Sequence, residues 1–177
     1  MKIFEHVYLV GSGKCGFDMT NPSDCNVYLI DGGNELALID AGTGLSSKEI
    51  IENIEAYGFS PKKIKFILLT HFHADHAGGA AKLSKLTGAK IVAHEDGQHL
   101  LETADENAID LVKARLNGYY PADYIFEPCK LDQKLKDNAA FSVGSLEFKA
   151  RLLPGHSLFD TYYFAKNKHK HISLFSG

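Results

Sequence analysis

The chain has 177 residues, of which 45% are hydrophobic and 23% charged, and its formal net charge is −3. This length and composition are typical of one globular domain with a substantial core. The charge balance argues against a nucleic-acid partner, because the lysines are scattered except in 166–170, which we interpret as a solvated turn. No apolar stretch is long enough to cross a bilayer as a helix, so we expect no membrane partner.

The N-terminal part of the chain predicts strands. Apolar and alternating patterns indicate strands near 3–10, 25–31 and 35–40. Glu5 and His6 lie where a secretory signal peptide would need an apolar core. We therefore expect a cytoplasmic protein whose first segment is a strand.

The cysteines agree with a reducing compartment. Cys15, Cys25 and Cys129 are odd in number and share no CxxC spacing, so free thiols are expected. A cysteine metal ligand is conceivable, although none of the three lies in a ligand-like motif.

A helix and a buried strand follow the first strands. Residues 46–57 predict a helix, with a possible capping box in Ser46 and Glu49 and a C-terminal end at Gly58. The continuous apolar run near 64–69 predicts a strand buried on both faces.

The most informative segment of the chain comes directly after this strand. His71 and His73 are two residues apart, so in an extended stretch both rings point to the same side. Asp75 and His76 follow, at the beginning of a helix predicted to continue through 77–87. Imidazole and carboxylate groups are the usual zinc ligands, so this junction of strand and helix predicts a metal site.

The remainder of the chain predicts two more helices and then a second group of strands. A short strand at 90–93 precedes the two helices at 95–103 and 105–116. Four strands are expected after them, near 141–143, 146–153, 162–165 and 172–175. Between the two groups, Tyr119, Tyr120 and Tyr124 could line a substrate pocket or could cap the edge of the core.

The spacing of residues 71–76 resembles the HxHxDH signature of the metallo-β-lactamase-fold superfamily. Two more blocks resemble the family and occur in its order: a strand pair that ends in Asp40, and residues 153–157, which contain His156. The resemblance is to hydrolases of general glyoxalase II-like character.

The resemblance implies a fold of the α/β (α+β) class. It is an αβ/βα sandwich, in which two mixed sheets are flanked by helices, and residues 1–177 would form a single domain. In the family, the strand that corresponds to 172–175 is followed by a metal-bridging aspartate, a further helix and strand, and a last histidine. This chain ends at Gly177, so we expect the domain to lack its C-terminal part.

The resemblance also implies the metal ligands. His71, His73 and His156 would hold one Zn²⁺ and leave a fourth position for water, which is the arrangement of a catalytic site. Asp75 and His76 would supply part of a second site, which is therefore incomplete. Zinc is the expected metal, with iron or manganese as alternatives. The expected catalyst is a zinc-bound hydroxide, which Asp75 could orient or deprotonate.

The expected reaction is hydrolysis of an ester, thioester, lactone or related bond in a small-molecule substrate. Two alternatives are a mononuclear iron enzyme similar to persulfide dioxygenases and a metal-binding fragment without catalytic activity. Many hydrolases of this fold have Thr-Pro-Gly after the third histidine, whereas this chain has residues 157–160, Ser-Leu-Phe-Asp. The subfamily and the activity of this chain are therefore open, and a homo-oligomer is possible.

Overall fold

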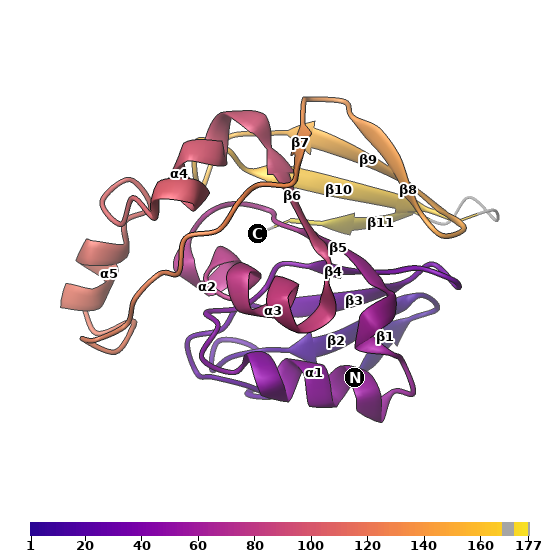
Figure 1. Ribbon diagram of the computed structural model, residues 1–177, viewed down its shortest axis with the longest axis horizontal. Helices are drawn as coiled ribbons and strands as arrows, with labels where there is room; N and C mark the ends of the chain where they lie inside the picture. Colours follow the sequence, from indigo (N-terminus) through magenta and orange to yellow (C-terminus); the bar gives the residue numbers. More distant parts are fainter. Residues whose placement is uncertain (168–171, 177) are drawn as a thin grey trace.

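The structure, a computed structural model, describes residues 1–167 and 172–176 (Figure 1). Two sheets form its frame. The seven-stranded sheet has the spatial order β1 (Lys2–Phe4), β2 (Val7–Gly11), β3 (Val27–Asp31), β4 (Leu36–Ile39), β5 (Ile64–Leu68), β6 (Lys90–His94) and β7 (Gln133–Leu135). The four-stranded sheet has the order β11 (Ile172–Phe175), β10 (Thr161–Lys166), β9 (Leu146–Leu152) and β8 (Ala140–Val143).

The two sheets differ in strand direction. In the larger sheet β1 to β4 pair antiparallel, and β4 to β7 pair parallel. The smaller sheet pairs antiparallel throughout its described strands. The helices are α1 (Ser47–Ala56), α2 (Ala74–Ala77), α3 (Ala80–Thr87), α4 (Gln98–Thr103) and α5 (Leu111–Leu116), with 3₁₀ turns η1 (Pro61–Lys63) and η2 (Glu95–Gly97). None of the helices in the described part of the chain is both long and apolar enough to cross a bilayer.

One face of the larger sheet is covered by helices. Side chains alternate along a strand, so Leu29, Leu38 and Ile67 point to the same face. They belong to one apolar cluster with Ile50 of α1 and Leu83 of α3. Figure 1 shows both helices in the lower half of the view, away from the four-stranded sheet.

The opposite face of the larger sheet packs on the smaller sheet. The next residues along the strands, Ile39 and Leu68, lie in a second apolar cluster with Phe148 and Tyr163 of the four-stranded sheet. Tyr163 is fully buried, and its hydroxyl donates a hydrogen bond of 2.8 Å to the carbonyl of Leu69. The predicted fold class, two sheets flanked by helices, is confirmed.

Several predicted boundaries were wrong, for local reasons. The strand expected at 3–10 is two strands, because a turn at Glu5 and His6 divides it. The capping box does not form, since Ser46 precedes α1 without a side-chain cap bond. The helix expected at 77–87 begins earlier, as α2, and resumes as α3.

The C-terminal predictions were more accurate, with one strand missed. Only 111–116 of the helix expected at 105–116 forms, because Asp110 has a left-handed φ of 56° and ends the preceding turn. Strand β7 was not predicted, whereas the four later strands lie where they were expected. The predicted basic turn at 166–170 lies mostly outside the described residues.

Candidate metal centre

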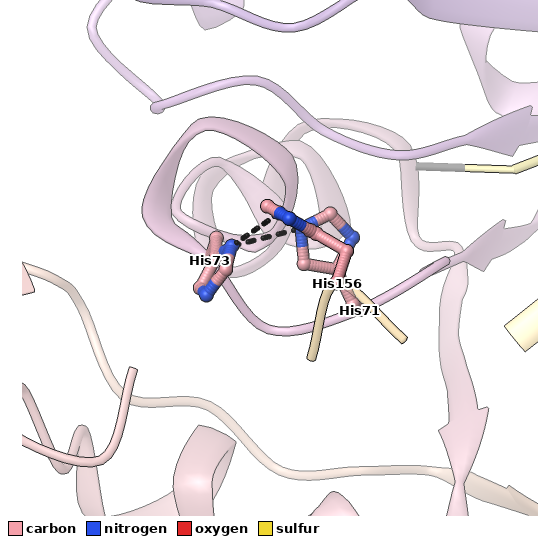
Figure 2. A group of neighbouring side chains, drawn as sticks. All are labelled: His71, His73 and His156. Carbon is pink, nitrogen blue, oxygen red and sulfur yellow. Dashed lines mark hydrogen bonds between the residues drawn. The ribbon is translucent and has the colours of Figure 1, made fainter. Parts of the chain in front are cut away.

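Three imidazole rings meet at the end of β5, where the chain leaves the sheet. His71 and His73 lie between β5 and α2, and His156 lies on the loop between β9 and β10. His73 Nδ1 is 3.1 Å from His71 Nε2 and 2.9 Å from His156 Nε2, as the dashed lines in Figure 2 mark. The structure therefore brings together three predicted ligands from two distant segments of the chain.

The rings of His71 and His73 are held in the neutral state. Burial, reinforced by the neighbouring imidazoles of His76 and His73, lowers the pKa of His71 to about 2. Burial and His156 also lower the pKa of His73. A neutral imidazole keeps a nitrogen lone pair that can bind a cation.

The tautomer of His71 follows from its contact with Thr70. The Thr70 hydroxyl lies 2.8 Å from Asp40 Oδ2 and 3.0 Å from Oδ1, so its single proton is donated to that carboxylate. It can therefore only accept from His71 Nδ1, 3.1 Å away. The proton on Nδ1 leaves a lone pair on Nε2, the atom that faces His73.

A hydrogen-bonded turn holds His156 in place. Asp160 Oδ2 accepts from the backbone N–H groups of His156 at 2.7 Å and Ser157 at 2.9 Å, and Oδ1 accepts from the Ser157 hydroxyl at 2.5 Å. Burial alone would raise the pKa of Asp160, but these hydrogen bonds hold it below its usual range. At the end of the turn, Thr161 N donates to Thr70 O over 2.7 Å, which fixes the loop against the end of β5.

Asp75 and His76, the other predicted ligands, lie on α2 beside the three-histidine group. His76 Nδ1 donates to Asp40 Oδ2 over 2.8 Å, and its Nε2 lies 3.4 Å from Asp75 Oδ2. Burial alone would raise the pKa of Asp75, but the hydrogen bond with His76 lowers it to about 2. Asp75 is therefore an ionised carboxylate at neutral pH.

The tyrosine loop contributes to this side of the site. The Tyr120 hydroxyl donates to Asp75 Oδ1 over 3.1 Å, and its ring stacks on Tyr124 with centroids 5.2 Å apart. Tyr124 is buried and donates to the carbonyl of Thr43, whereas Tyr119 is exposed. The sequence suggested that these tyrosines either line a substrate pocket or cap the edge of the core. The buried position of Tyr124 agrees with a cap on the core, whereas Tyr120 contacts Asp75, a predicted site residue.

The sequence did not single out two residues of the site. Asp40 was recognised only as the end of a strand, yet its carboxylate contacts Thr70 and His76. Cys25 also lies here: its sulfur, an Asp40 oxygen and a His76 nitrogen are all within 4.8 Å of one another. Asp40 has a left-handed φ of 62°, which turns the backbone away from the strand. No sequence pattern predicted this conformation. Cys25 carried no signal beyond its residue type.

A cavity of about 720 Å³ opens beside the three histidines. His73 and His156 form part of its lining, and Phe72, Leu158 and Phe159 form much of its apolar wall. The lining also contains Asp110 and His99, which are polar. The cavity is large enough for a small molecule and brings it against two of the three imidazoles.

Comparison with known proteins gives a consistent result. The family profile described as the metallo-beta-lactamase superfamily matches residues 20–167. The chain is 27% identical over 150 residues to a probable metallo-hydrolase of Burkholderia pseudomallei, an alignment that covers 77% of this chain and 47% of that protein. It is 35% identical over 71 residues to a hydroxyacylglutathione hydrolase of Anaeromyxobacter dehalogenans, covering 40% of this chain and 26% of that protein.

Among solved structures, the chain is similar to a subclass B3 metallo-beta-lactamase of Bradyrhizobium japonicum. The TM-score is 0.78 at 30% identity, and the superposition covers 99% of this chain and 61% of that enzyme. The chain spans less than half the length of the two curated relatives above.

Proposed function

The chain belongs to the metallo-beta-lactamase superfamily, and on this premise we propose that it acts as a metal-dependent hydrolase. The bond cleaved would be an ester, thioester, lactone or related bond of a small molecule. The convergence of His71, His73 and His156 is the observation that carries the proposal.

The three histidines fit a divalent metal ion. Their ligand nitrogens lie within 4.8 Å of one another, the rings of His71 and His73 are held neutral, and Thr70 directs the lone pair of His71 toward the group. A ring fixed by a hydrogen bond at its other nitrogen is a regular feature of histidine ligands. Three imidazoles suit zinc, and iron or manganese are alternatives. When bound, such a metal lowers the pKa of a coordinated water from 15.7 to roughly 7 and so supplies a nucleophile at neutral pH.

The residues of the chain supply the remaining functions. Asp75, ionised and close to the histidines, is the proposed acceptor of the proton of the attacking water. Tyr120 fixes the orientation of that carboxylate through its hydroxyl. The apolar wall made by Phe72 and Phe159 excludes water from the substrate and favours substrates with an apolar group next to the scissile bond.

Metal analysis and a hydrolysis assay on the same samples test this function. Purified protein is loaded with zinc, its metal content is measured, and ester, thioester and lactone substrates are offered. We expect metal-dependent hydrolysis of at least one class, and we expect His73→Ala to lose both the metal and the activity.

The matched control is His6→Ala, because His6 is only partly buried and lies outside the site. It should retain metal and activity. Metal retention by His73→Ala at full occupancy would contradict the assigned site. Oxygen uptake with a persulfide substrate, in the absence of any hydrolysis, would instead favour the iron oxygenase alternative.

A further inference from the structure

The cavity beside the three histidines has a single carboxylate, Asp110, among the described residues of its lining, and no lysine or arginine lies with it there. Most of the remaining wall is apolar and is made by Phe72, Leu100, Ile109, Leu158 and Phe159. We propose that Asp110 binds the ammonium group of the substrate, and that the cavity selects α-aminoacyl esters or thioesters with an apolar side chain. The inference rests on the proposed function, because it narrows the substrate class of that site.

The backbone on both sides of Asp110 is fixed by the fold. Ile109 and Leu111 are buried, with exposed fractions of 4% and 1%, in the apolar cluster between the larger sheet and its helices. The Asp110 N–H donates to the carbonyl of Asn107 over 3.2 Å, and the Asp110 carbonyl accepts from the N–H of Ala114 over 3.0 Å. The position of this residue is therefore set before any ligand binds, which lowers the entropy lost on binding.

The Asp110 carboxylate does not stabilise the helix that follows it. An aspartate directly before a helix normally accepts from a backbone N–H of the first turn. Asp110 precedes α5 without such a bond, and its φ of 56° is uncommon for a residue other than glycine. Within the described part of the chain its carboxylate accepts no hydrogen bond and forms no ion pair, and Arg115 of α5 pairs with Glu106 instead. An uncommon backbone conformation and a carboxylate without an internal partner favour a function in binding.

Asp110 acts on one of the three histidines. Burial lowers the pKa of His73, and the negative charges of Asp75 and Asp110 oppose that lowering. His73 and Asp110 also line the same cavity. A cation bound by Asp110 would therefore lie near the bond that is cleaved. In an α-aminoacyl group the ammonium is attached to the carbon next to the carbonyl, which is the closest that these two groups can be.

An α-aminoacyl ester matches three features of the cavity at once. Its carbonyl belongs at the histidines, its ammonium at Asp110, and its side chain against Phe72 and Phe159. Hydrolysis joins the oxygen of water to the carbonyl carbon and breaks the bond from that carbon to the alcohol oxygen or thiol sulfur. The leaving atom takes one proton of the water, and the other passes to solvent. The volume of about 720 Å³ admits an aminoacyl group as large as phenylalanine.

The alternative interpretation is that Asp110 only orients the ring of His73. Asp110→Asn separates the two, because asparagine also adopts left-handed backbone and the change removes only the charge. Zinc-loaded protein is offered L-phenylalanine ethyl ester and ethyl hydrocinnamate, which differ by the ammonium group. Both are measured at about pH 7, where an α-amino group with a pKa of about 7.7 is mostly protonated.

We expect the ratio of kcat/KM between the charged and the uncharged ester to fall by about tenfold in Asp110→Asn, since a hydrogen bond between charged groups is lost. Comparing ratios removes the intrinsic reactivity of the charged ester. Asp123→Asn, on an exposed turn outside the cavity, is the matched control and should keep the wild-type ratio. An unchanged ratio in Asp110→Asn overturns the proposal. An equal fall for both esters, together with loss of zinc, overturns it in favour of a function in positioning His73.

A binding measurement tests the ammonium site without hydrolysis. Phenethylammonium and phenethyl alcohol are titrated into zinc-loaded protein, and their dissociation constants are obtained by ligand-observed NMR. We expect wild type to bind the ammonium about tenfold more tightly than the alcohol, and Asp110→Asn to lose this preference. Equal affinities in wild type overturn the proposal and leave the hydrolase intact. Selective binding by a protein that hydrolyses no ester, thioester or lactone supports the ammonium site and contradicts the proposed function instead.

Discussion

Asp160 holds His156 by its backbone rather than by its ring: Oδ2 accepts from the His156 N–H over 2.7 Å. The loop is thus shaped by a carboxylate four residues along the chain, in place of a Pro-Gly turn. The imidazole keeps both nitrogens free of this contact, so the residue that positions the ligand does not compete for it.

Asp160→Ala should therefore weaken metal binding without removing a ligand. Loss of these hydrogen bonds should lower the free energy of unfolding by about 2 kcal/mol and lower metal affinity by about 10- to 100-fold. Denaturant unfolding and a zinc titration measure the two effects. Asp137→Ala is the control, since Asp137 accepts similar bonds from Arg151 and Leu152 at the end of β9 but does not bond to His156. If both variants bind zinc equally well, Asp160 does not position His156.

Thr70→Val should disturb the tautomer of His71. The hydroxyl at this position accepts from His71 Nδ1 while it donates to Asp40, and Val has a similar shape without it. We expect the affinity of the three-histidine site for zinc to fall by about 10- to 100-fold. Thr70→Ser keeps the hydroxyl and should restore most of the affinity. Equal affinities in the two variants would show that the hydroxyl has no such function.

Tyr120→Phe removes the hydroxyl that donates to Asp75 Oδ1. If this bond orients the carboxylate, kcat should fall by about tenfold, with KM little changed, because substrate binds elsewhere. Steady-state kinetics on the substrate that is hydrolysed fastest measure the changes in kcat and KM separately. Tyr119→Phe, at an exposed position, should behave as wild type. A fall in KM and kcat together in Tyr120→Phe would point to a substrate contact.

Ala108→Trp tests the cavity beside the histidines, since Ala108 is exposed and belongs to its lining. The larger side chain should raise KM by about tenfold for substrates with bulky apolar groups and have less effect on small ones. Metal content should not change. Ala122→Trp, on an exposed turn outside the cavity, controls for the added indole. Uniform inhibition of all substrates would argue against a substrate-binding cavity.

Glu35 should make stability depend on pH far from the metal site. Its carboxylate accepts from Lys65 Nζ at 2.6 Å and from the Gly144 N–H at 3.0 Å, and these bonds, in that order, hold its pKa below 4.5. Because the folded-state pKa is the lower one, the stabilisation is present above the unfolded-state value and is lost as the pH falls through the folded-state value.

Glu35→Gln should therefore be less stable than wild type near pH 7, and the difference should shrink below about pH 4. Urea unfolding of metal-free protein at both pH values measures this and avoids effects of metal loss. A difference that stays constant across that range would show that the charge of Glu35 does not contribute.

The sequence allowed prediction of those parts of the site that are close together in the chain. A strand followed by two histidines at a spacing of two and a helix carrying Asp75 is a local pattern, and its geometry follows from strand and helix periodicity. His156 was placed by resemblance, because no local pattern connects it to residues that lie 83 positions away.

The features that were missed depend on contacts across space. Asp40 and Cys25 become site residues only because a left-handed backbone at Asp40 and the Asp24–Thr43 hydrogen bonds bring their loops to α2. Similarly, the helix predicted at 105–116 fails in its first half because Asp110 takes a positive φ. Such choices of conformation at single residues leave no periodic trace in the sequence.

The three histidines come from different sheets: His71 and His73 follow β5 of the larger sheet, and His156 follows β9 of the smaller one. A metal held by all three would act as a cross-link between the two halves of the sandwich. Its binding would depend on how the layers are aligned, so a substitution at Tyr163, which packs between the two sheets and is not a predicted ligand, should alter metal affinity by shifting one layer relative to the other. In this architecture, metal binding at the edge of the sandwich therefore depends on how the interior between the two sheets is packed.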